Sequence, residues 1–482
     1  MTSSKGSKIC KSQELAERLC KLHVRRLARP LNMMAMSKYF GRQKRPAILG
    51  AAGEETEQGR FSYFACEPIE VFEFCTGGSK PFEKLQRTLD KYKLKEGDSV
   101  LLPSGVFAGG WIGYFSYELG RYVEKLPDSA VDDICMPLIQ LCFYDKLICY
   151  DGIEKVAWLI GLEVEGESES VGEKFSWLEK AIAEAEQIYV NRPVRGKVDG
   201  VDASGMACNM SKEYYFESFE RIKKYIYDGD VYQINFSQRF CADFDSEAVD
   251  LFNWQNRYNP SPFGAFIDGG DFQIVSASPE LFIRIQDGVI TTRPIKGTRP
   301  RGSDEQINRE NSLELFASEK EKAELNMIID LERNDLGRIC EYGTIKVAEA
   351  RAIESYSTVF HAVATVQGRL RDEISFVDCL KAIFPGGSIT GAPKIRAMEI
   401  IDELEPTQRG VYTGCIGFVG VDGNVCLNIA IRTIIIKDGA AYAQAGGGIV
   451  ADSQPEAEWD ETLVKAKALA AGIEAVNKKM RY

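Results

Sequence analysis

A lysine in a short basic segment is the residue whose type and setting most directly suggest chemistry. Lys296 lies in RPIKGTRPRG at 293–302, between a proline and a glycine, with no hydrophobic run to bury it. Nucleophilic use of a lysine requires partial desolvation or nearby cations that favour the neutral amine, and Arg293, Arg299 and Arg301 are such cations. The segment alone leaves two interpretations open: a nucleophilic lysine, or a solvated loop that binds an anion.

Two pairs of glutamates have a spacing suited to magnesium. Glu321 with Glu324, and Glu458 with Glu461, are three residues apart in predicted helices, so each pair projects from one helix face. Mg2+ prefers a few carboxylates with water and substrate oxygens, so one carboxylate from each helix makes an open site. The alternative is a pair of ordinary solvated helix faces, since Lys465 follows Glu461 by four residues.

Glycine-rich backbone and one arginine add candidate anion-binding groups. The segment FPGGSITGAPKIRAMEI at 384–400 precedes a predicted helix, which suits either an anion or a purely structural loop. Ala392 stands where a Walker loop needs lysine, which disfavours nucleotide binding. The glycines at 446–448 end a predicted strand and can expose backbone N–H groups to a carboxylate. Arg432 lies in the middle of a predicted apolar strand, where a buried arginine requires an anion.

Composition restricts the class of protein. The chain has 482 residues, 45% of them hydrophobic, which is enough for a sizeable core. A formal net charge of −12 argues against a nucleic-acid partner, and no apolar run is long enough for a membrane span. Thirteen cysteines without a Cys-x-x-Cys pair favour a reducing, cytoplasmic location. With only His23 and His361 available, histidine-based triads or metal sites are disfavoured.

The elements that must position these residues indicate an α+β fold with antiparallel sheets flanked by helices. We predict two lobes, an N-terminal lobe at 1–190 and a catalytic domain at 211–477, joined by a polar linker at 191–210. Leu15, Leu19 and Leu22 recur at helical spacing, so the first thirty residues are expected to form a surface helix.

Alternation and capping residues locate the elements of the predicted catalytic domain. The expected helices span residues 211–227, 318–333, 394–404 and 455–477. The expected strands span 231–240, 263–268, 272–279, 281–288, 289–297, 412–423, 425–439 and 440–450.

The order of the motifs resembles that of the chorismate-utilising enzymes, and within them the component I subunits of aminodeoxychorismate synthases. The motifs are SASPE (276–280), RPIKGTRPRG, SEKEKAELNMIIDLERNDLGRIC (318–340), FPGGSITGAPKIRAMEIIDELE (384–405) and GGGIVADSQPEAEWDET (446–462). The likeness covers about 211–475 and extends weakly through GRFSY and GGWIGYFSYELGR in the first lobe. It implies two largely antiparallel sheets packed as a sandwich.

The resemblance also implies roles for individual residues. Glu324 and Glu461 match Mg2+ ligands, with Glu321 and Glu458 beside them. Glu280 matches a general acid that protonates the departing C4 hydroxyl, Lys296 matches a nucleophile at C2, and His361 matches a histidine beside the ring. The groups that match substrate-binding positions are Tyr412, Arg432, Gly447, Gly448, Lys465 and Thr298.

The implied reaction converts chorismate and ammonia into 4-amino-4-deoxychorismate, the precursor of 4-aminobenzoate and folate, through a covalent lysine intermediate. Anthranilate synthases carry alanine at the position of Lys296, and isochorismate and salicylate synthases carry a lysine base where this chain has Gln233. Ammonia is expected from a separate glutaminase subunit. The alternatives are anthranilate synthase component I and a non-catalytic chorismate-binding regulatory subunit.

The first lobe departs from the feedback-inhibited anthranilate synthases. Their Leu-Glu-Ser element is not visible around LGAAGEETEQGRFSY at 49–63, which disfavours regulation by tryptophan. Seven residues remain candidates for lining a bound indole: Arg60, Phe61, Ser62, Tyr63, Ser261, Pro262 and Phe263.

Overall fold

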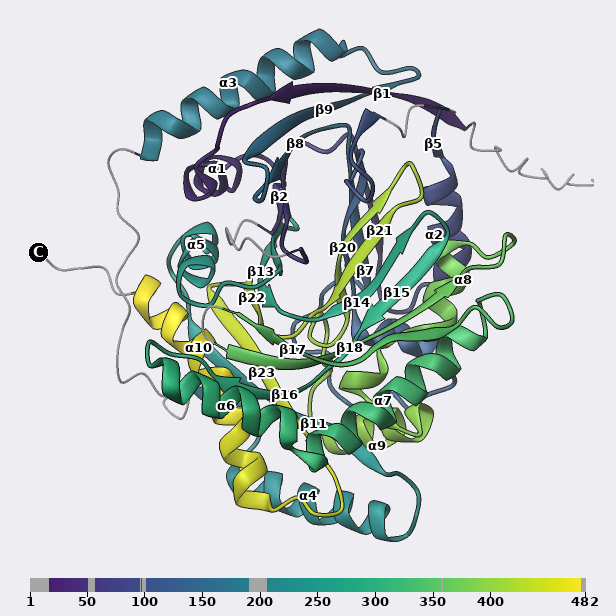
Figure 1. Ribbon diagram of the computed structural model, residues 1–482, viewed down its shortest axis with the longest axis vertical. Coiled ribbons are helices and arrows are strands. Elements are labelled where there is room, and N and C mark those ends of the chain that lie inside the picture. The colour runs from purple at the N-terminus through teal and green to yellow at the C-terminus, as the bar shows by residue number, and fades with distance from the viewer. Residues whose placement is uncertain are drawn as a thin grey trace, which may run out of the picture.

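Two large β-sheets form the frame of the computed structural model, which describes residues 17–50, 57–95, 97, 101–189, 206–356 and 359–477 (Figure 1). The sheets pack against each other through one continuous hydrophobic core. Paired strands run antiparallel, except that β1 and β5 are parallel. The predicted α+β sandwich with flanking helices is confirmed.

The larger sheet has 13 strands and the smaller sheet has 10. In spatial order the larger sheet contains β10 (Ala207–Cys208), β11 (Gln233–Asp243), β23 (Ala440–Ile449), β22 (Thr433–Lys437), β13 (Phe272–Ser278), β12 (Phe263–Asp268), β2 (Ala47–Leu49), β3 (Phe61–Ala65), β8 (Lys146–Asp151), β9 (Val156–Val164), β1 (Arg18–Leu27) and β5 (Tyr92–Leu94), with β19 (Gly391–Ala392) beside β11. The smaller sheet contains β16 (Ile295–Pro300), β18 (Val359–Arg369), β15 (Val289–Arg293), β14 (Leu281–Gln286), β21 (Val425–Ile429), β20 (Cys415–Gly420), β6 (Gly110–Phe115), β7 (Ile139–Tyr144) and β4 (Glu70–Phe74), with β17 (Lys346–Ser355) beside β18.

Helices cover the sheets from outside. The outer face of the larger sheet packs against α1 (Met33–Phe40), α3 (Val171–Tyr189), α5 (Ala248–Tyr258) and α10 (Pro455–Asn477). The other described helices are α2 (Pro81–Asp90), α4 (Lys212–Tyr227), α6 (Glu305–Ala317), α7 (Glu319–Gly337), α8 (Phe376–Ile383) and α9 (Lys394–Leu404), with short 3-10 turns η2 (Tyr117–Tyr122) and η4 (Gly387–Ile389). None of the described helices is long and apolar enough to cross a membrane.

Because its side chains alternate, one strand can contribute to the hydrophobic cores on both faces of the larger sheet. In β22, Ile434 and Ile436 join the core under the helices, whereas Ile435 joins the core between the sheets. Successive side chains of a strand point to opposite faces, so an apolar run such as TIIIK suits a strand buried on both sides.

Local capping signals located the helices well. The predicted helices at 394–404 and 455–477 coincide with α9 and α10. The helix predicted at 211–227 is α4, where the Ser211 hydroxyl accepts a hydrogen bond from the Tyr214 N–H at 3.2 Å.

Two element predictions are wrong. Residues 18–27 form strand β1, not a helix, because Cys20 and Leu22 alternate inward while the strand pairs with β9, and Leu19 is exposed. Residues 1–16, including Leu15, lie outside the described part of the chain. The segment 425–439 is two strands in different sheets, β21 and β22, and Arg432 lies at the break with φ 49°.

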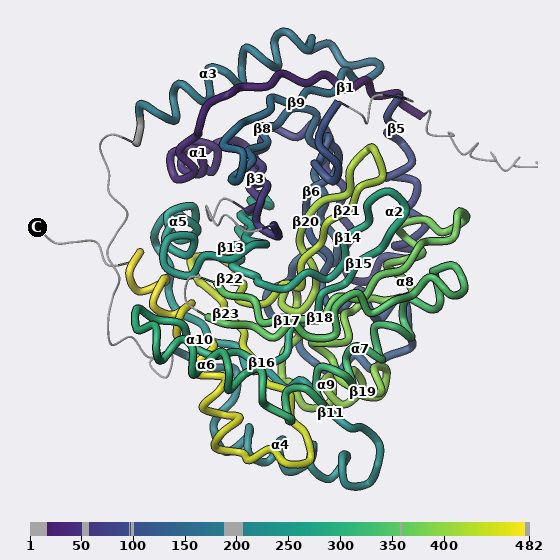
Figure 2. Tube along the Cα trace, viewed as in Figure 1, coloured from purple at the N-terminus to yellow at the C-terminus, as the bar shows by residue number. Residues whose placement is uncertain are grey.

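Strands from both predicted lobes share both sheets. Figure 2 shows β6 beside β20, and β12 pairs with β2 in the larger sheet. The division into 1–190, 191–210 and 211–477 stays a prediction, and most of the linker lies outside the described residues. The interleaving means that the two segments are joined by backbone hydrogen bonds and not only by the linker.

We expect the buried ion pair between α3 and the β7–β8 turn to be important for stability. Lys174 Nζ lies 2.5 Å from the Asp145 carboxylate and donates to the Leu162 carbonyl, and both charged side chains are fully buried. Lys174→Met leaves Asp145 buried without its cation, so urea unfolding should show a loss of about 3–5 kcal/mol. Adding Asp145→Asn should recover part of that loss; an unchanged unfolding midpoint in the single variant would contradict the expectation.

Candidate active site at the junction of the two sheets

The predicted site residues gather where the chain crosses from one sheet to the other. One connection leads from β13 to β14 and carries Glu280, and another leads from β21 to β22 and carries Arg432. Ala277 N–H donates to the Arg432 carbonyl at 3.0 Å, and Ile429 N–H donates to the Glu280 carbonyl at 3.0 Å. These backbone bonds fix the two crossings relative to each other.

Lys296, on β16, contacts the loop between α8 and α9. Its Nζ donates a hydrogen bond to the Ser388 carbonyl at 3.2 Å. Burial lowers the pKa of Lys296; Glu324 and Glu280 oppose that shift, whereas Lys465 adds to it. The neutral, nucleophilic form of the amine is therefore favoured relative to a free lysine.

The neighbouring arginines are not the cause of this shift, which corrects an expectation from the sequence. Arg293 and Arg299 form ion pairs with glutamates, and Arg301 donates to a main-chain carbonyl. The cation that assists burial is Lys465, from α10. Arginines close to Lys296 in sequence are thus engaged with other acceptors.

Glu280 is a buried carboxyl next to Lys296. Ile295 N–H lies 3.4 Å from Glu280 Oε1, and the Ser388 side chain is a second hydrogen-bond partner. Burial raises the pKa of Glu280, although these hydrogen bonds and the charge of Lys296 oppose the shift. A carboxyl that keeps its proton can donate it to a leaving group.

His361, on β18, is buried and held by Thr298. His361 Nδ1 and Thr298 Oγ1 are 2.9 Å apart, and His361 Nε2 has no hydrogen-bond partner among the described residues. Burial lowers the pKa of His361 to about 3, and the nearby Arg432 contributes to the shift. The imidazole is therefore neutral at physiological pH, with one nitrogen available to a ligand.

Two helix faces bring four carboxylates to the site, Glu321 and Glu324 from α7 and Glu458 and Glu461 from α10. Burial raises the pKa of Glu324 and of Glu458, and in both cases the charge of Glu461 adds to the shift. Burial also acts to raise the pKa of Glu461, but Lys465, 2.6 Å away, holds it below its usual value. Among the described residues, no three metal-ligating side chains are grouped tightly enough to form a preassembled metal site.

Two glycines allow the carboxylates to approach the backbone. A Cβ at Gly297, where φ is +90°, would lie 2.6 Å from Glu321 Oε2, and a Cβ at Gly447 would lie 2.9 Å from Glu458 Oε2. Any side chain at these positions would displace a carboxylate. Glu321 pairs with Arg299 at 2.8 Å, yet its buried Oε2 has no hydrogen-bond partner among the described residues.

The remaining predicted binding groups surround the same junction. The Arg432 guanidinium has no ion pair or hydrogen bond to any described residue, and burial lowers its pKa. Tyr412 is buried in the turn before β20, and Gly448 faces Asn235 across the β11–β23 pair. Lys465 Nζ also donates to the Gly446 carbonyl at 2.8 Å. A guanidinium with no ion pair or hydrogen bond to a described residue fits an anionic ligand.

A separate cavity of about 390 Å³ contains most of the candidate indole pocket. Arg60, Phe61, Tyr63, Pro262 and Phe263 line it. That the cavity binds an indole stays a prediction. Two predicted members, Ser62 and Ser261, are buried but are not among the lining residues. None of the seven belongs to the cluster around Lys296.

Sequence reasoning did not single out Ser388 or Arg409. Ser388 lies inside the glycine-rich loop noted as a candidate anion site, but its contacts with Lys296 and Glu280 join segments about a hundred residues apart. Arg409 carries no local signal, because its partners become visible only in the folded chain.

Comparisons with known proteins agree with this geometry. A family model described as chorismate binding enzyme matches residues 52–471. Aminodeoxychorismate synthase component 1 of Bacillus subtilis is 40% identical over 368 residues, which are 76% of this chain and 77% of that protein. Anthranilate synthase component 1 of Pseudomonas aeruginosa is 42% identical over 373 residues, 76% of this chain and 75% of that protein. Sequence similarity of this size does not separate the two reactions.

The solved structure of anthranilate synthase component I from Streptococcus pneumoniae shares the fold. It superimposes with a TM-score of 0.72 at 32% identity and covers 87% of this chain and 93% of that one.

We expect the buried neutral His361 to make the protein less stable as pH falls. Its folded pKa of about 3 lies below the value of an unfolded histidine, about 6.5, so the unfolded state takes up a proton first. Stability attributable to this residue is therefore lost between about pH 6.5 and pH 3. Urea unfolding across this range should show a shallower pH dependence for His361→Gln than for the wild type; identical slopes would contradict the expectation.

Proposed function

Because the chain belongs to the family of chorismate-binding enzymes, we propose that it is an aminodeoxychorismate synthase component I. It would convert chorismate and ammonia into 4-amino-4-deoxychorismate. The observation that carries the proposal is Lys296, whose amine lies among Glu280, Glu324 and Lys465 with a lowered pKa. An anthranilate synthase is expected to carry alanine there, which has no nucleophile.

The proposed reaction has two displacements. The neutral Lys296 amine attacks C2 of the ring while Glu280 gives its proton to the C4 hydroxyl, which leaves as water. Ammonia then attacks C4, and the bond between C2 and Lys296 breaks, which returns the neutral lysine; the ammonium group formed at C4 gives a proton back to Glu280. Burial shifts Lys296 and Glu280 toward their neutral forms. The attack by the amine and the proton transfer from the carboxyl each require the neutral form.

Arg432 and the neutral His361 are proposed to orient the substrate. Arg432 forms no ion pair with a described residue, so a substrate carboxylate can bind its guanidinium in a bidentate pair. His361 keeps its Nδ1 with Thr298 and offers Nε2 to the ring substituents. Gly447, Gly448, Tyr412 and Lys465 would complete the binding of the second carboxylate.

Mg2+ is the proposed cofactor, with Glu324 and Glu461 as its ligands and Glu321 and Glu458 beside them. The donor set fits a hard cation, because carboxylates from two helices lie close enough for the charge of Glu461 on α10 to raise the pKa of Glu324 on α7. Across the described part of the chain the metal-ligating side chains form no preassembled cluster, which suits a cation that takes most of its ligands from substrate and water. When bound, the ion would supply charge stabilisation at the ring carboxylate.

A separate glutaminase subunit is the proposed source of ammonia. Relatives from Bacillus subtilis, Salmonella typhimurium and Escherichia coli are each named component 1 of aminodeoxychorismate synthase. Anthranilate synthase component I is kept as the second candidate, since relatives with that name match equally well.

Product identity tests the proposal directly. Purified chain with chorismate, Mg2+ and an ammonium salt should yield 4-amino-4-deoxychorismate by mass spectrometry, without pyruvate. Excess EDTA should stop turnover and added Mg2+ should restore it. Anthranilate with an equal amount of pyruvate would support the second candidate instead, and chorismate binding without turnover would indicate a regulatory subunit.

Removing the nucleophile should separate chemistry from binding. We expect Lys296→Ala to lower kcat by roughly 100-fold or more, the scale on which positioned catalytic groups act, while chorismate affinity changes little. Wild type incubated with chorismate and Mg2+ but without ammonium, then quenched and digested with trypsin, should give the peptide carrying Lys296 with the added mass of chorismate less one water.

The matched control is Lys322→Ala, because Lys322 is exposed on α7 and its one ion pair among the described residues is with Glu319 at 3.5 Å. It should retain wild-type kcat. If Lys296→Ala also retains it, the nucleophile role is wrong.

A further inference from the structure

Ser388 connects the two residues to which the proposed reaction assigns covalent and acid roles. Its carbonyl accepts the hydrogen bond of Lys296 Nζ at 3.2 Å, and its side chain is hydrogen-bonded to the Glu280 carboxyl. Ser388 is itself buried, in the 3-10 turn η4 between α8 and α9. A displacement of this turn would therefore move Lys296 and Glu280 apart or out of alignment.

Buried charged side chains bind the peptide groups on both sides of Ser388. Before it, the Gly387 N–H donates to Glu332 of α7, which is 5% exposed. After it, the Ile389 carbonyl accepts from Arg409 Nη1 at 3.0 Å. The turn is thus held from one side by a carboxyl and from the other by a guanidinium.

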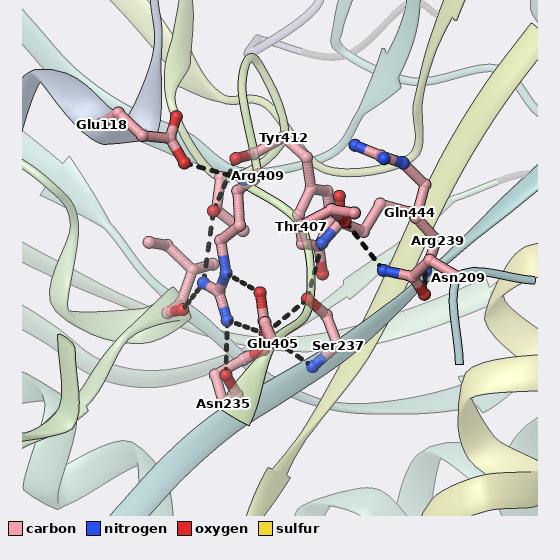
Figure 3. Close-up of polar contacts among 12 residues, drawn as sticks. Glu118, Asn209, Asn235, Ser237, Arg239, Glu405, Thr407, Arg409, Tyr412 and Gln444 are labelled. Carbon is pink, nitrogen blue, oxygen red and sulfur yellow. Dashed lines mark hydrogen bonds and ion pairs between the residues drawn. The ribbon is translucent and has the colours of Figure 1, made fainter. Parts of the chain in front are cut away.

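Arg409 is wholly buried, and its donors are all used (Figure 3). Nε and Nη2 bind the two oxygens of Glu405 at 2.8 and 2.6 Å, and Nη2 also donates to the Asn235 carbonyl at 2.6 Å. Nη1 donates to Thr413 Oγ1 as well as to Ile389. A planar guanidinium with every N–H engaged has one position, so it fixes the segments that it binds.

The acceptors of Arg409 belong to segments that carry binding groups. Asn235 lies opposite Gly448 in the β11–β23 pair, and Arg409 itself precedes Tyr412 by three residues. Glu405 accepts from the Ser237 N–H and hydroxyl at 2.9 and 2.7 Å, on the same strand as Asn235. Arg409 therefore joins the Ser388 turn to the strand pair that carries the glycines of the site.

Glu332 has a narrower set of contacts. Burial and the neighbouring Asp335 raise the pKa of Glu332 to about 7, and Asp335 is paired with Lys394. A Cβ at Gly387 would lie 3.2 Å from Glu332 Oε1, which shows how closely the carboxyl approaches this peptide. Glu332 has no hydrogen bond to the strands of the site among the described residues.

We propose that Arg409 and Glu332 are positioning residues that clamp the turn at 386–390, so that Ser388 holds Lys296 and Glu280 in a reactive arrangement. The catalytic consequence rests on the proposed function, whereas the clamp itself does not. Misplacement of reacting groups by about 1 Å can cost about 100-fold in rate, so loss of the clamp should appear in kcat.

The different contacts of Glu332 and Arg409 predict different changes in kcat and KM, measured by chorismate consumption. Glu332→Leu should lower kcat about tenfold or more with KM within about threefold of wild type, because only the turn is released. Glu332→Gln keeps an oxygen acceptor for Gly387 and should recover most of the activity. Arg409→Met should lower kcat and raise KM together, and Arg409→Lys should recover part of both.

Lys174→Met provides the matched control, because it also breaks a wholly buried ion pair, but in the α3 region and not at the site. At a temperature where each variant is folded by circular dichroism, it should keep wild-type kcat and KM. If the activity of the Arg409 and Glu332 variants falls only in proportion to the fraction of protein that is folded, the proposal is overturned. A Glu332→Gln variant as impaired as Glu332→Leu would assign Glu332 a role through its charge and not as a clamp.

Hydrogen exchange gives a readout that does not depend on the reaction. In Arg409→Met and Glu332→Leu, amides in peptides covering 384–391 should exchange faster than in wild type, while Lys174→Met leaves them unchanged. Unchanged exchange in both site variants would overturn the clamp even if turnover falls. Faster exchange in a chain that forms a different chorismate product would leave the clamp intact and contradict only the proposed function.

Discussion

The site depends on two chain crossings that are hydrogen-bonded to each other. Glu280 and Arg432 are each carried by a connection between the sheets, and the backbone bonds of Ala277 and Ile429 hold these connections together. Neither sheet could move relative to the other without breaking these bonds inside the hydrophobic core, where unpaired peptide groups are costly. Glu280 and Arg432 are thus fixed by the same backbone that joins the two layers.

Burial then sets the charge state of the groups around this junction. Lys296 and Glu280 attract each other, which favours the ion pair, but for both residues desolvation is the larger effect. The pKa of the amine falls and that of the carboxyl rises, so the neutral pair gains population. His361 is kept uncharged by the same cause. Arg409 differs, because its donors are engaged with the Glu405 carboxylate and with carbonyls, and Glu405 raises the pKa of its guanidinium despite burial.

Predictions from the sequence succeeded where the signal was local. Ser211 capped a helix as expected, and the bounds of α9 and α10 followed from their flanking residues. Motif order also brought together Lys296, Glu280 and the four glutamates. Predictions failed where pairing with a distant strand decided the structure. Residues 18–27 form a strand because they pair with β9. Arg432 lies at a break between two strands of different sheets, and the apolar residues next to it in the chain give no sign of that break. The contacts of Ser388 and Arg409 link distant segments, so no sequence window could contain them.

The position of β23 in the larger sheet sets the order in which the site can form. This strand follows all the other described strands in the chain, yet it lies between β11 and β22, in the interior of the sheet. A growing polypeptide therefore leaves β11 without that neighbour, and the glycines of β23 and the carboxylates of α10 are missing from the site, until residues beyond 440 have been made. From the synthesis of β11 to that of β23 the nascent protein has an open strand edge, which is a position where other strands can pair, and the candidate site is completed only in the last steps.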